Sequence, residues 1–277
     1  MTSNLPQVLI NLDNHVSLDK KNFDEFLAVC SNMGTTEVCL SSNNPIHIYQ
    51  DGAWGKATER NIQTEEISNL VSGLFGISGT TILNGGNAID FSHEIKVQNS
   101  RKRFRINVTS ITERAKFGLD LTCRLLDGRP PRLSEIGLTE EDYEMFDKSR
   151  GINWVTGPTG SGKSTTLHAY VRRTVEGPEN ELNESHGSQR KFRFSGKRIV
   201  EYAAPIEYVY REVNCKHGFV VQSEIGRNLP SFEEAGRNLL RRKPSIAILG
   251  EARDKETVAQ IPNIGAAGHL LYTTFHG

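Results

Sequence analysis

The sequence predicts an α/β protein built in two parts, and two textures along the chain indicate this. Up to about residue 130, strand-like runs are mixed with helical patterns, as in an α+β module. After residue 150, strand-like and helical segments alternate, which is typical of a parallel sheet with helices on its faces. Residues 127–137, DGRPPRLSEIG, have the glycine, proline and charge content of a connection. We therefore expect domains at 1–130 and 151–277, joined by a linker over 131–150.

Hydrophobic spacing locates the individual elements. Phe23, Phe26 and Leu27 recur at helical spacing and predict a helix over 22–31, and a similar apolar stripe predicts one over 64–75. Strands are expected in the first part at 37–40, 45–49 and 103–110. In the second part, apolar runs predict strands at 152–156, 198–203, 246–249 and 270–275. A helix is expected over 164–174 and an exposed polar loop over 177–190.

Composition excludes several functional classes. Lys and Arg together number 33, as do Asp and Glu, so the formal charge is zero and we expect no direct DNA specificity. No apolar stretch approaches the ~20 residues of a membrane-spanning helix, and the N-terminus does not resemble a signal peptide. The four cysteines are widely spaced and form no CxxC pair, which argues against disulfides and a zinc knuckle. A cytoplasmic protein is expected.

A phosphate-binding motif follows the strand expected at 152–156. Residues 157–164 read GPTGSGKS, the GxxxxGKS pattern between a strand and a helix that defines a P-loop. The backbone N–H groups of this glycine-rich loop would surround a phosphate. The Lys163 side chain would reach the β- and γ-phosphates. The Ser164 hydroxyl is the predicted Mg²⁺ ligand, next to Thr165. The predicted cofactor-binding set is Gly157, Pro158, Thr159, Gly160, Ser161, Gly162, Lys163, Ser164 and Thr165. The alternative is a glycine-rich turn with an incidental lysine.

A second acidic site is expected at the end of another strand. The apolar run 246–249 is followed by Gly250 and Glu251, which is the layout of a Walker B element. A carboxylate at the carboxyl end of a parallel strand lies where ligands bind in open α/β sheets. Glu251 is therefore the candidate for orienting an attacking water. The alternative is an acid that caps the start of a helix.

Several ordered motifs resemble one family. They are APIEY at 204–208, SEIGRNLPSF at 223–232, RRKPSIAILGEARD at 241–254, GEARDKET at 250–257 and GHLLYTTFHG at 268–277. Together they resemble the secretion ATPase superfamily of type II and type IV secretion and pilus retraction, and most of all the DotB and TraJ ATPases of type IVB secretion and IncI-type conjugation. The resemblance implies a RecA-like P-loop core after a PAS-like domain, ATP and Mg²⁺ as cofactors, and a hexameric ring. It also implies peripheral association with an inner-membrane secretion or conjugation complex.

The resemblance assigns further residues. Many family members carry an acidic box where this chain has Ala203 and Ala204, so that Glu207 is the acid that remains and becomes a catalytic candidate. Glu201, two residues upstream of Ala203, shares its strand face but cannot simply replace it. His269 and His276 occupy the family's histidine box, which would couple the γ-phosphate site to the neighbouring domain, so that His269 becomes a nucleotide-binding candidate and His276 a catalytic candidate. Without the resemblance, each of these residues has an ordinary structural or surface interpretation.

Arginines are expected to complete the site across a subunit boundary. Arg103 and Arg105 alternate with apolar residues on an expected strand. The resemblance implies that they, together with Arg124, approach nucleotide phosphates, where a guanidinium stabilises transition-state charge. A half-exposed strand with a solvated face is the ordinary alternative. Arg237 and Arg241, four residues apart before the Walker B strand, are also candidates.

The function predicted from all of this is Mg²⁺-dependent ATP hydrolysis that powers secretion, conjugation or pilus dynamics. Lys163, Glu207, Glu251 and His276 form the predicted catalytic set. One alternative is an assembly or adaptor subunit that binds ATP and scarcely hydrolyses it, and another is a P-loop helicase. The chain ends directly after the histidine box, so we expect it to lack the helical C-terminal region of the family.

Overall fold

A computed structural model describes residues 18–98, 100–126, 128–179, 196–250 and 255–275. The chain divides into two compact units, residues 1–128 and residues 129–277, which are described separately below. Along the described part of the chain, no helix combines the length and the apolar character needed to cross a membrane.

In the part that the structure describes, the first unit is an antiparallel sheet with three helices. Its strand order is β3-β2-β1-β6-β5-β4, and each neighbouring pair runs antiparallel. The strands are β1 (Glu37–Ser41), β2 (His47–Gln50), β3 (Ala53–Lys56), β4 (Ile89–Val97), β5 (Ser100–Glu113) and β6 (Lys116–Leu126). The helices are α2 (Lys20–Asn32), α3 (Thr64–Leu74) and α4 (Ser78–Asn84). The elements expected at 22–31, 37–40, 45–49, 64–75 and 103–110 are confirmed within a few residues.

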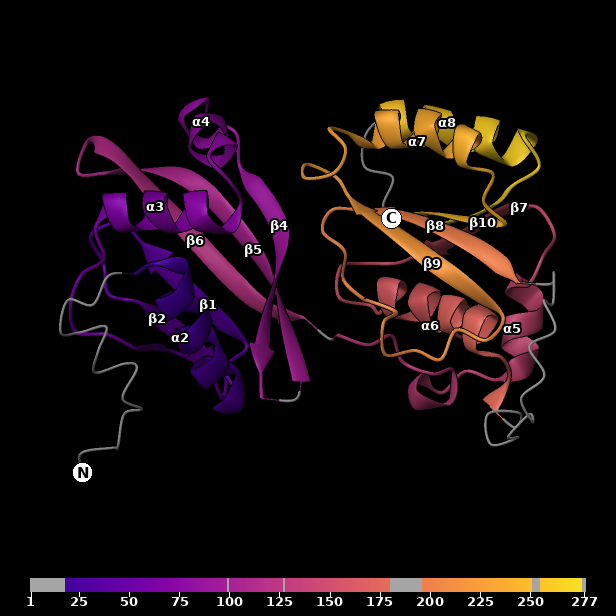
Figure 1. The fold of residues 1–277 in the computed structure, drawn as a ribbon, viewed down its shortest axis with the longest axis horizontal. Helices are drawn as coiled ribbons and strands as arrows, with labels where there is room; N and C mark the ends of the chain where they lie inside the picture. Colours follow the sequence, from indigo (N-terminus) through magenta and orange to yellow (C-terminus); the bar gives the residue numbers. More distant parts are fainter. Residues whose placement is uncertain (1–17, 99, 127, 180–195, 251–254, 276–277) are drawn as a thin grey trace. The chain divides into compact units, whose positions relative to one another are not determined.

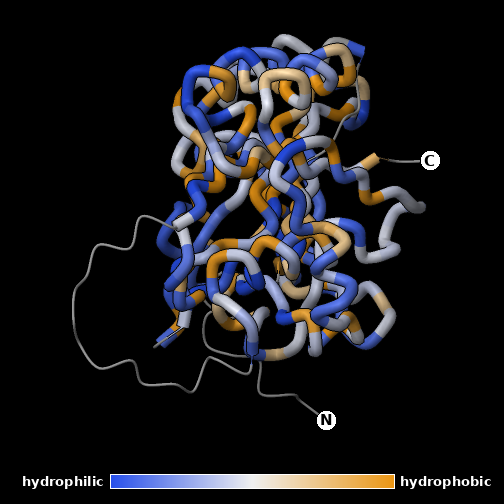
Figure 2. Tube along the Cα trace, turned by 90° about the vertical axis from the view of Figure 1, so that its right-hand side faces the viewer, coloured by the Kyte–Doolittle hydropathy of each residue, from blue (hydrophilic) through white to orange (hydrophobic). Residues whose placement is uncertain are grey.

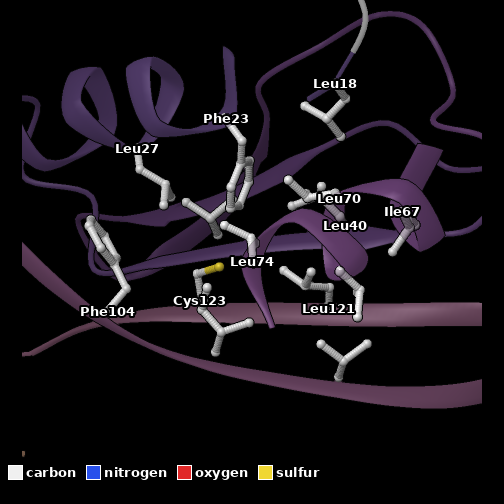
Figure 3. Packing of buried hydrophobic residues seen from close by; sticks show 14 of the residues in the cluster. Leu18, Phe23, Leu27, Leu40, Ile67, Leu70, Leu74, Phe104, Leu121 and Cys123 are labelled. Atoms are coloured by element: carbon white, nitrogen blue, oxygen red, sulfur yellow. The ribbon is translucent and has the colours of Figure 1, made fainter. Parts of the chain in front are cut away.

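The core of the first unit lies between the helices and one face of the sheet. Alternate residues of β4 are buried and their neighbours are less so, which is the pattern of a strand with one covered face. In Figure 3, Phe23 and Leu27 of α2 and Leu70 of α3 point toward Leu121 and Cys123 of β6. The helices therefore supply the cover that the apolar face of the sheet requires.

The second unit is a parallel sheet with helices on both faces (Figure 1). Its strand order is β7-β11-β10-β8-β9, and all four pairings are parallel. The strands are β7 (Gly151–Thr156), β8 (Lys197–Ala203), β9 (Gly218–Glu224), β10 (Ile246–Leu249) and β11 (Leu270–Phe275). The helices are α5 (Glu140–Phe146), α6 (Lys163–Glu176), α7 (Phe232–Arg242) and α8 (Lys255–Ala266). The predicted α/β core is confirmed, and the chain's last described strand separates β7 from β10.

Two apolar clusters cover the two faces of this parallel sheet. Ile246 and Ile248 of β10 belong to the cluster under α6, whereas Ala247 and Leu249 belong to the cluster under α7 and α8. Figure 2 shows hydrophobic and hydrophilic residues interspersed along the chain. Because both faces are buried, β10 has no polar residue, as expected of a central parallel strand.

Residues 131–150, expected to form a linker, are instead largely folded onto the second unit. They contain a 3-10 turn (Ser134–Ile136) and α5, and Leu133 and Tyr143 are buried in the cluster under α6. The Arg172 guanidinium of α6 donates to the carbonyl of Pro130 at 2.7 Å and pairs with Glu176 at 2.7 Å. Buried apolar side chains and a buried arginine fix this segment, and the boundary between the units falls at residues 128/129, within the stretch 127–137 whose composition predicted a connection.

Candidate nucleotide-binding site

The glycine loop adopts a backbone that only glycine accepts readily. β7 leads into the loop, in which Gly157, Gly160 and Gly162 have φ of 154°, 79° and 85°. A Cβ placed on Gly157 would lie 2.8 Å from Ser161 Oγ. The glycine spacing therefore reflects two requirements, left-handed backbone and close packing within the loop. Helix α6 begins directly after it, at Lys163, with Gly162 as the N-cap residue.

The Lys163 side chain lies over the loop. Its Nζ donates to the carbonyl oxygens of Gly157 at 2.9 Å and Pro158 at 2.8 Å, and the side chain is buried. The ammonium group is thus held at the same end of α6 as the N–H groups of the first helical turn. Positive charge and aligned N–H donors at one helix end are the components of an anion site. Ser164 and Thr165 follow in that first turn, both half-buried.

The parallel sheet brings other segments to the edge where the loop lies. Because β7, β11 and β10 are parallel, their carboxyl ends share one edge. At this edge the N–H of Gly250 donates to the backbone carbonyl of Tyr202 at 2.8 Å, and the Thr274 hydroxyl donates to the Gly250 carbonyl at 2.6 Å. Glu251 and His276 follow directly in the sequence but lie outside the described residues. Their predicted roles therefore stay predictions.

His269 lies at the opposite edge of the sheet, and its predicted place beside the phosphates is wrong. Leu270 pairs with Gly151 and Phe275 pairs with Thr156, so His269 precedes the amino end of β11. Five residue steps along a strand correspond to about 17 Å. The His269 ring instead places Nδ1 3.0 Å from the carbonyl oxygen of Pro244. Motif similarity alone gives the place of His269 in the chain and not the sheet edge at which it lies.

The segment after β8, which contains Glu207, contacts the first turn of α6 through Tyr208. The Tyr208 hydroxyl lies 3.1 Å from Thr165 Oγ1, and the Tyr208 carbonyl accepts from Gln222 Nε2 of β9 at 2.7 Å. On the other side of Glu207, the N–H of Ile206 donates to Glu224 Oε2 at 3.2 Å. Glu207 itself is half-buried. The structure thus places the segment of this predicted catalytic acid next to the predicted nucleotide-binding helix.

A buried polar network beneath the loop was missed by the sequence reasoning. His168 Nδ1 lies 2.6 Å from the Tyr210 hydroxyl, and Nε2 lies 3.4 Å from Glu201 Oε1. Burial lowers the pKa of His168 to about 3 and raises the pKa of Tyr210 well above its ordinary value. A neutral imidazole has one N–H, so a Tyr210 hydroxyl that donates to Nδ1 leaves the N–H on Nε2, toward Glu201. Gln222 Nε2 also donates to Glu201 Oε2 at 2.8 Å.

The only sequence signal for this network is spacing. Thr165 and His168 are three residues apart on α6, and Tyr208 and Tyr210 are two residues apart in an extended segment. These spacings put each pair on one face of its element. Nothing in the sequence, however, shows that the two faces meet.

The candidate arginines lie on other elements, and Arg105, Arg124 and Arg237 are engaged in ion pairs. Arg105 of β5 contacts Asp90 of β4 through Nε at 3.0 Å and through Nη2, and Arg124 Nη2 of β6 lies 2.7 Å from Glu37. Both belong to the first unit, as does Arg103, and their predicted contact with phosphates of a neighbouring subunit stays a prediction. The other two arginine candidates are on α7 in the second unit.

On α7, Arg237 pairs with Glu233 and lies 3.7 Å from Glu234. Arg241 is in the last turn of the same helix. Helix α7 covers the face of the sheet opposite to α6. The fold therefore separates these two arginines from the glycine loop by the thickness of the sheet.

The fold and the loop define a nucleotide-binding α/β protein of the P-loop class. Residues 43–277 match the family model described as Type II/IV secretion system protein. The chain belongs to this family, and the resemblance seen in its sequence motifs is confirmed.

Individual relatives agree with this assignment. The type IV pilus retraction ATPase PilT of Pseudomonas aeruginosa is 29% identical over 252 residues, which cover 91% of this chain and 65% of PilT. The X-ray structure of the Legionella pneumophila ATPase DotB has a TM-score of 0.81 and 31% identity, covering 93% of this chain and 66% of DotB. A crystal structure of the pilus retraction motor PilT with bound ADP has a TM-score of 0.69 and 27% identity, covering 92% of this chain and 66% of that one.

Proposed function

We propose that this chain binds Mg²⁺-ATP at the glycine loop and hydrolyses it, acting as a traffic ATPase of a secretion, conjugation or pilus system. The observation that carries the proposal is the Lys163 ammonium held over a loop with left-handed glycines, at the start of α6. The similarity to proteins named as ATPases, one of them with bound ADP, supports the same conclusion.

The residues at this edge of the sheet suit the nucleotide. The loop N–H groups within residues 157–162 and the Lys163 ammonium would hold the phosphates. Because Gly157 has no Cβ, Ser161 can pack against it and the loop can keep its tight turn. Ser164 would hold Mg²⁺, which when bound neutralises negative charge on the phosphates. Glu251 would orient the attacking water, and Glu207 would support it from the segment beside α6.

Assembly into a hexameric ring is part of the proposal. Arg103, Arg105 and Arg124 would then supply positive charge to a phosphate of the neighbouring subunit. The ring would associate from the cytoplasm with an inner-membrane complex. The first unit would serve as the PAS-like domain, and the second unit, which begins at residue 129, would serve as the ATPase core.

Steady-state phosphate release tests the proposal. Release that depends on Mg²⁺, is lost in K163A and falls at least a hundredfold in E251Q supports it, since removing a group that organises the reacting water costs about 10²–10⁴-fold. Sizing the protein with and without Mg²⁺-ATP tests ring formation. A K163A variant that binds Mg²⁺-ATP in a calorimeter as tightly as the wild type refutes the site.

A second candidate function is an adaptor that binds ATP with little hydrolysis. It is favoured by Ala203 and Ala204, which replace the two acids expected from the family resemblance, and Ala203 is buried. Two results together would support the adaptor: Mg²⁺-ATP binds tightly in a way that depends on Lys163, and E251Q leaves phosphate release unchanged.

A further inference from the structure

Glu207 is flanked by three fixed points in the second unit. The preceding N–H, of Ile206, is held by the Glu224 carboxylate at 3.2 Å. The following carbonyl, of Tyr208, is held by Gln222 at 2.7 Å. Both of these partners come from β9, where residues 222 and 224 share one face of the strand. The third point is the Tyr208 hydroxyl, 3.1 Å from Thr165 Oγ1.

These three contacts differ in what they connect. Gln222 and Glu224 tie the segment to the sheet, whereas Tyr208 ties it to the helix that follows the glycine loop. Thr165 is adjacent to Ser164, the predicted Mg²⁺ ligand. The Tyr208 hydroxyl is therefore the contact that relates the position of Glu207 to the nucleotide-binding turn.

We propose that Tyr208 is a positioning residue for nucleotide hydrolysis, which its hydroxyl serves by holding the Glu207 segment against Thr165 at the first turn of α6. The inference rests on the proposed function and deepens it at the same site. Tyr208 itself touches no reacting atom in this proposal. Its ring packs beside His168, with ring centroids 5.0 Å apart. This ring contact does not depend on the hydroxyl, so Y208F should keep the ring in place.

Tyr210 provides a matched control in the same segment. Its hydroxyl also bonds to α6, but to His168, one turn further from the loop. Tyr208 and Tyr210 are equally buried, each with 6% of its surface exposed. Removing either hydroxyl deletes one hydrogen bond to α6, which is part-buried for Tyr208 and buried for Tyr210, so Y210F should lose at least as much stability as Y208F. Only one of them should change the relation between Glu207 and the loop.

The test is steady-state ATP hydrolysis by the full chain and its Y208F, Y210F and T165V variants. Y208F is expected to lower kcat about three- to tenfold with less than a twofold change in KM, the scale of one misplaced hydrogen bond. Y210F is expected to keep kcat within about twofold of the wild type. Because Y208F and T165V break the same contact, adding Y208F to T165V should lower kcat by less than twofold.

The outcomes separate this inference from the function on which it rests. If K163A abolishes turnover but Y208F retains wild-type kcat, the positioning role is refuted and the proposed function stands. Equal losses of kcat in Y208F and Y210F, with equal losses of thermal stability, show a merely structural role and also refute it. Absence of Lys163-dependent turnover in the wild type overturns the proposed function, and this inference with it.

Discussion

Mild acid should destabilise the second unit through His168. Burial lowers the pKa of this imidazole from 6.5 to about 3, and the titratable groups that face it are Tyr208, Tyr210 and Glu201. In the unfolded chain the pKa returns to about 6.5. Between these values the unfolded chain binds a proton that the folded chain does not, so the free energy of unfolding falls as the pH falls from 6.5 toward 3.

The size of this effect follows from the pKa difference. Each unit corresponds to about 1.4 kcal/mol, so the stability lost is about 2 kcal/mol at pH 5 and approaches about 5 kcal/mol near pH 3. Above pH 6.5 the histidine is neutral in both states and contributes no pH dependence. The loss at pH 5 is a large fraction of the stability of a typical domain.

Urea unfolding at pH 7 and pH 5 measures this loss. The chain has two tryptophans, Trp54 in the first unit and Trp154 in the second, so a W54F background makes fluorescence report on the second unit. Replacing His168 in H168Q should reduce the difference between the two pH values by about 2 kcal/mol. H47Q, which removes a histidine from β2 of the first unit, is the control. An unchanged pH dependence in H168Q refutes the reasoning.

Two further predictions concern the loop and α6. G157A should weaken Mg²⁺-ATP binding about tenfold or more in calorimetry, because strain of 1–3 kcal/mol is expected where φ is left-handed and the space is filled. G55A, a substitution at a position with open space, is the control. Wild-type affinity in G157A contradicts the prediction. R172M should destabilise the second unit by about 3 kcal/mol in urea unfolding, since it leaves the Glu176 carboxylate buried without its main partner. R172M/E176M should recover most of that loss, and a single variant as stable as the wild type contradicts the reasoning.

Elements with a strong local pattern could be predicted from the sequence. The strands at 246–249 and 270–275 were predicted to the residue, because each is an apolar run with breaks at both ends. β4 was missed although its burial alternates regularly, since half of its residues are polar and the segment begins after a glycine-rich turn. Tertiary contacts therefore decided what the local pattern left open.

The candidate site could be predicted only where its residues are contiguous. The loop at 157–165 needs nothing but its own sequence and the helix that follows it. The contact between Tyr208 and Thr165 joins residues that are far apart in the chain, and no local pattern encodes it. His269 shows the opposite error, because similarity of a motif gives a residue's place in the chain and not the sheet edge at which it lies.

The two tyrosines divide the contacts between α6 and the segment after β8 into separable parts. Tyr210 reaches His168, whose neutral imidazole makes stability depend on pH, while Tyr208 reaches Thr165 at the loop. Y210F should therefore lower the stability of the second unit and leave kcat nearly unchanged, whereas Y208F should lower kcat. The same helix thus contacts the segment after β8 through two tyrosine hydroxyls, and only the Tyr208 hydroxyl is expected to affect catalysis. This separation requires that the two contacts differ in their distance from the glycine loop, since Thr165 lies in the first turn of α6 and His168 one turn further along.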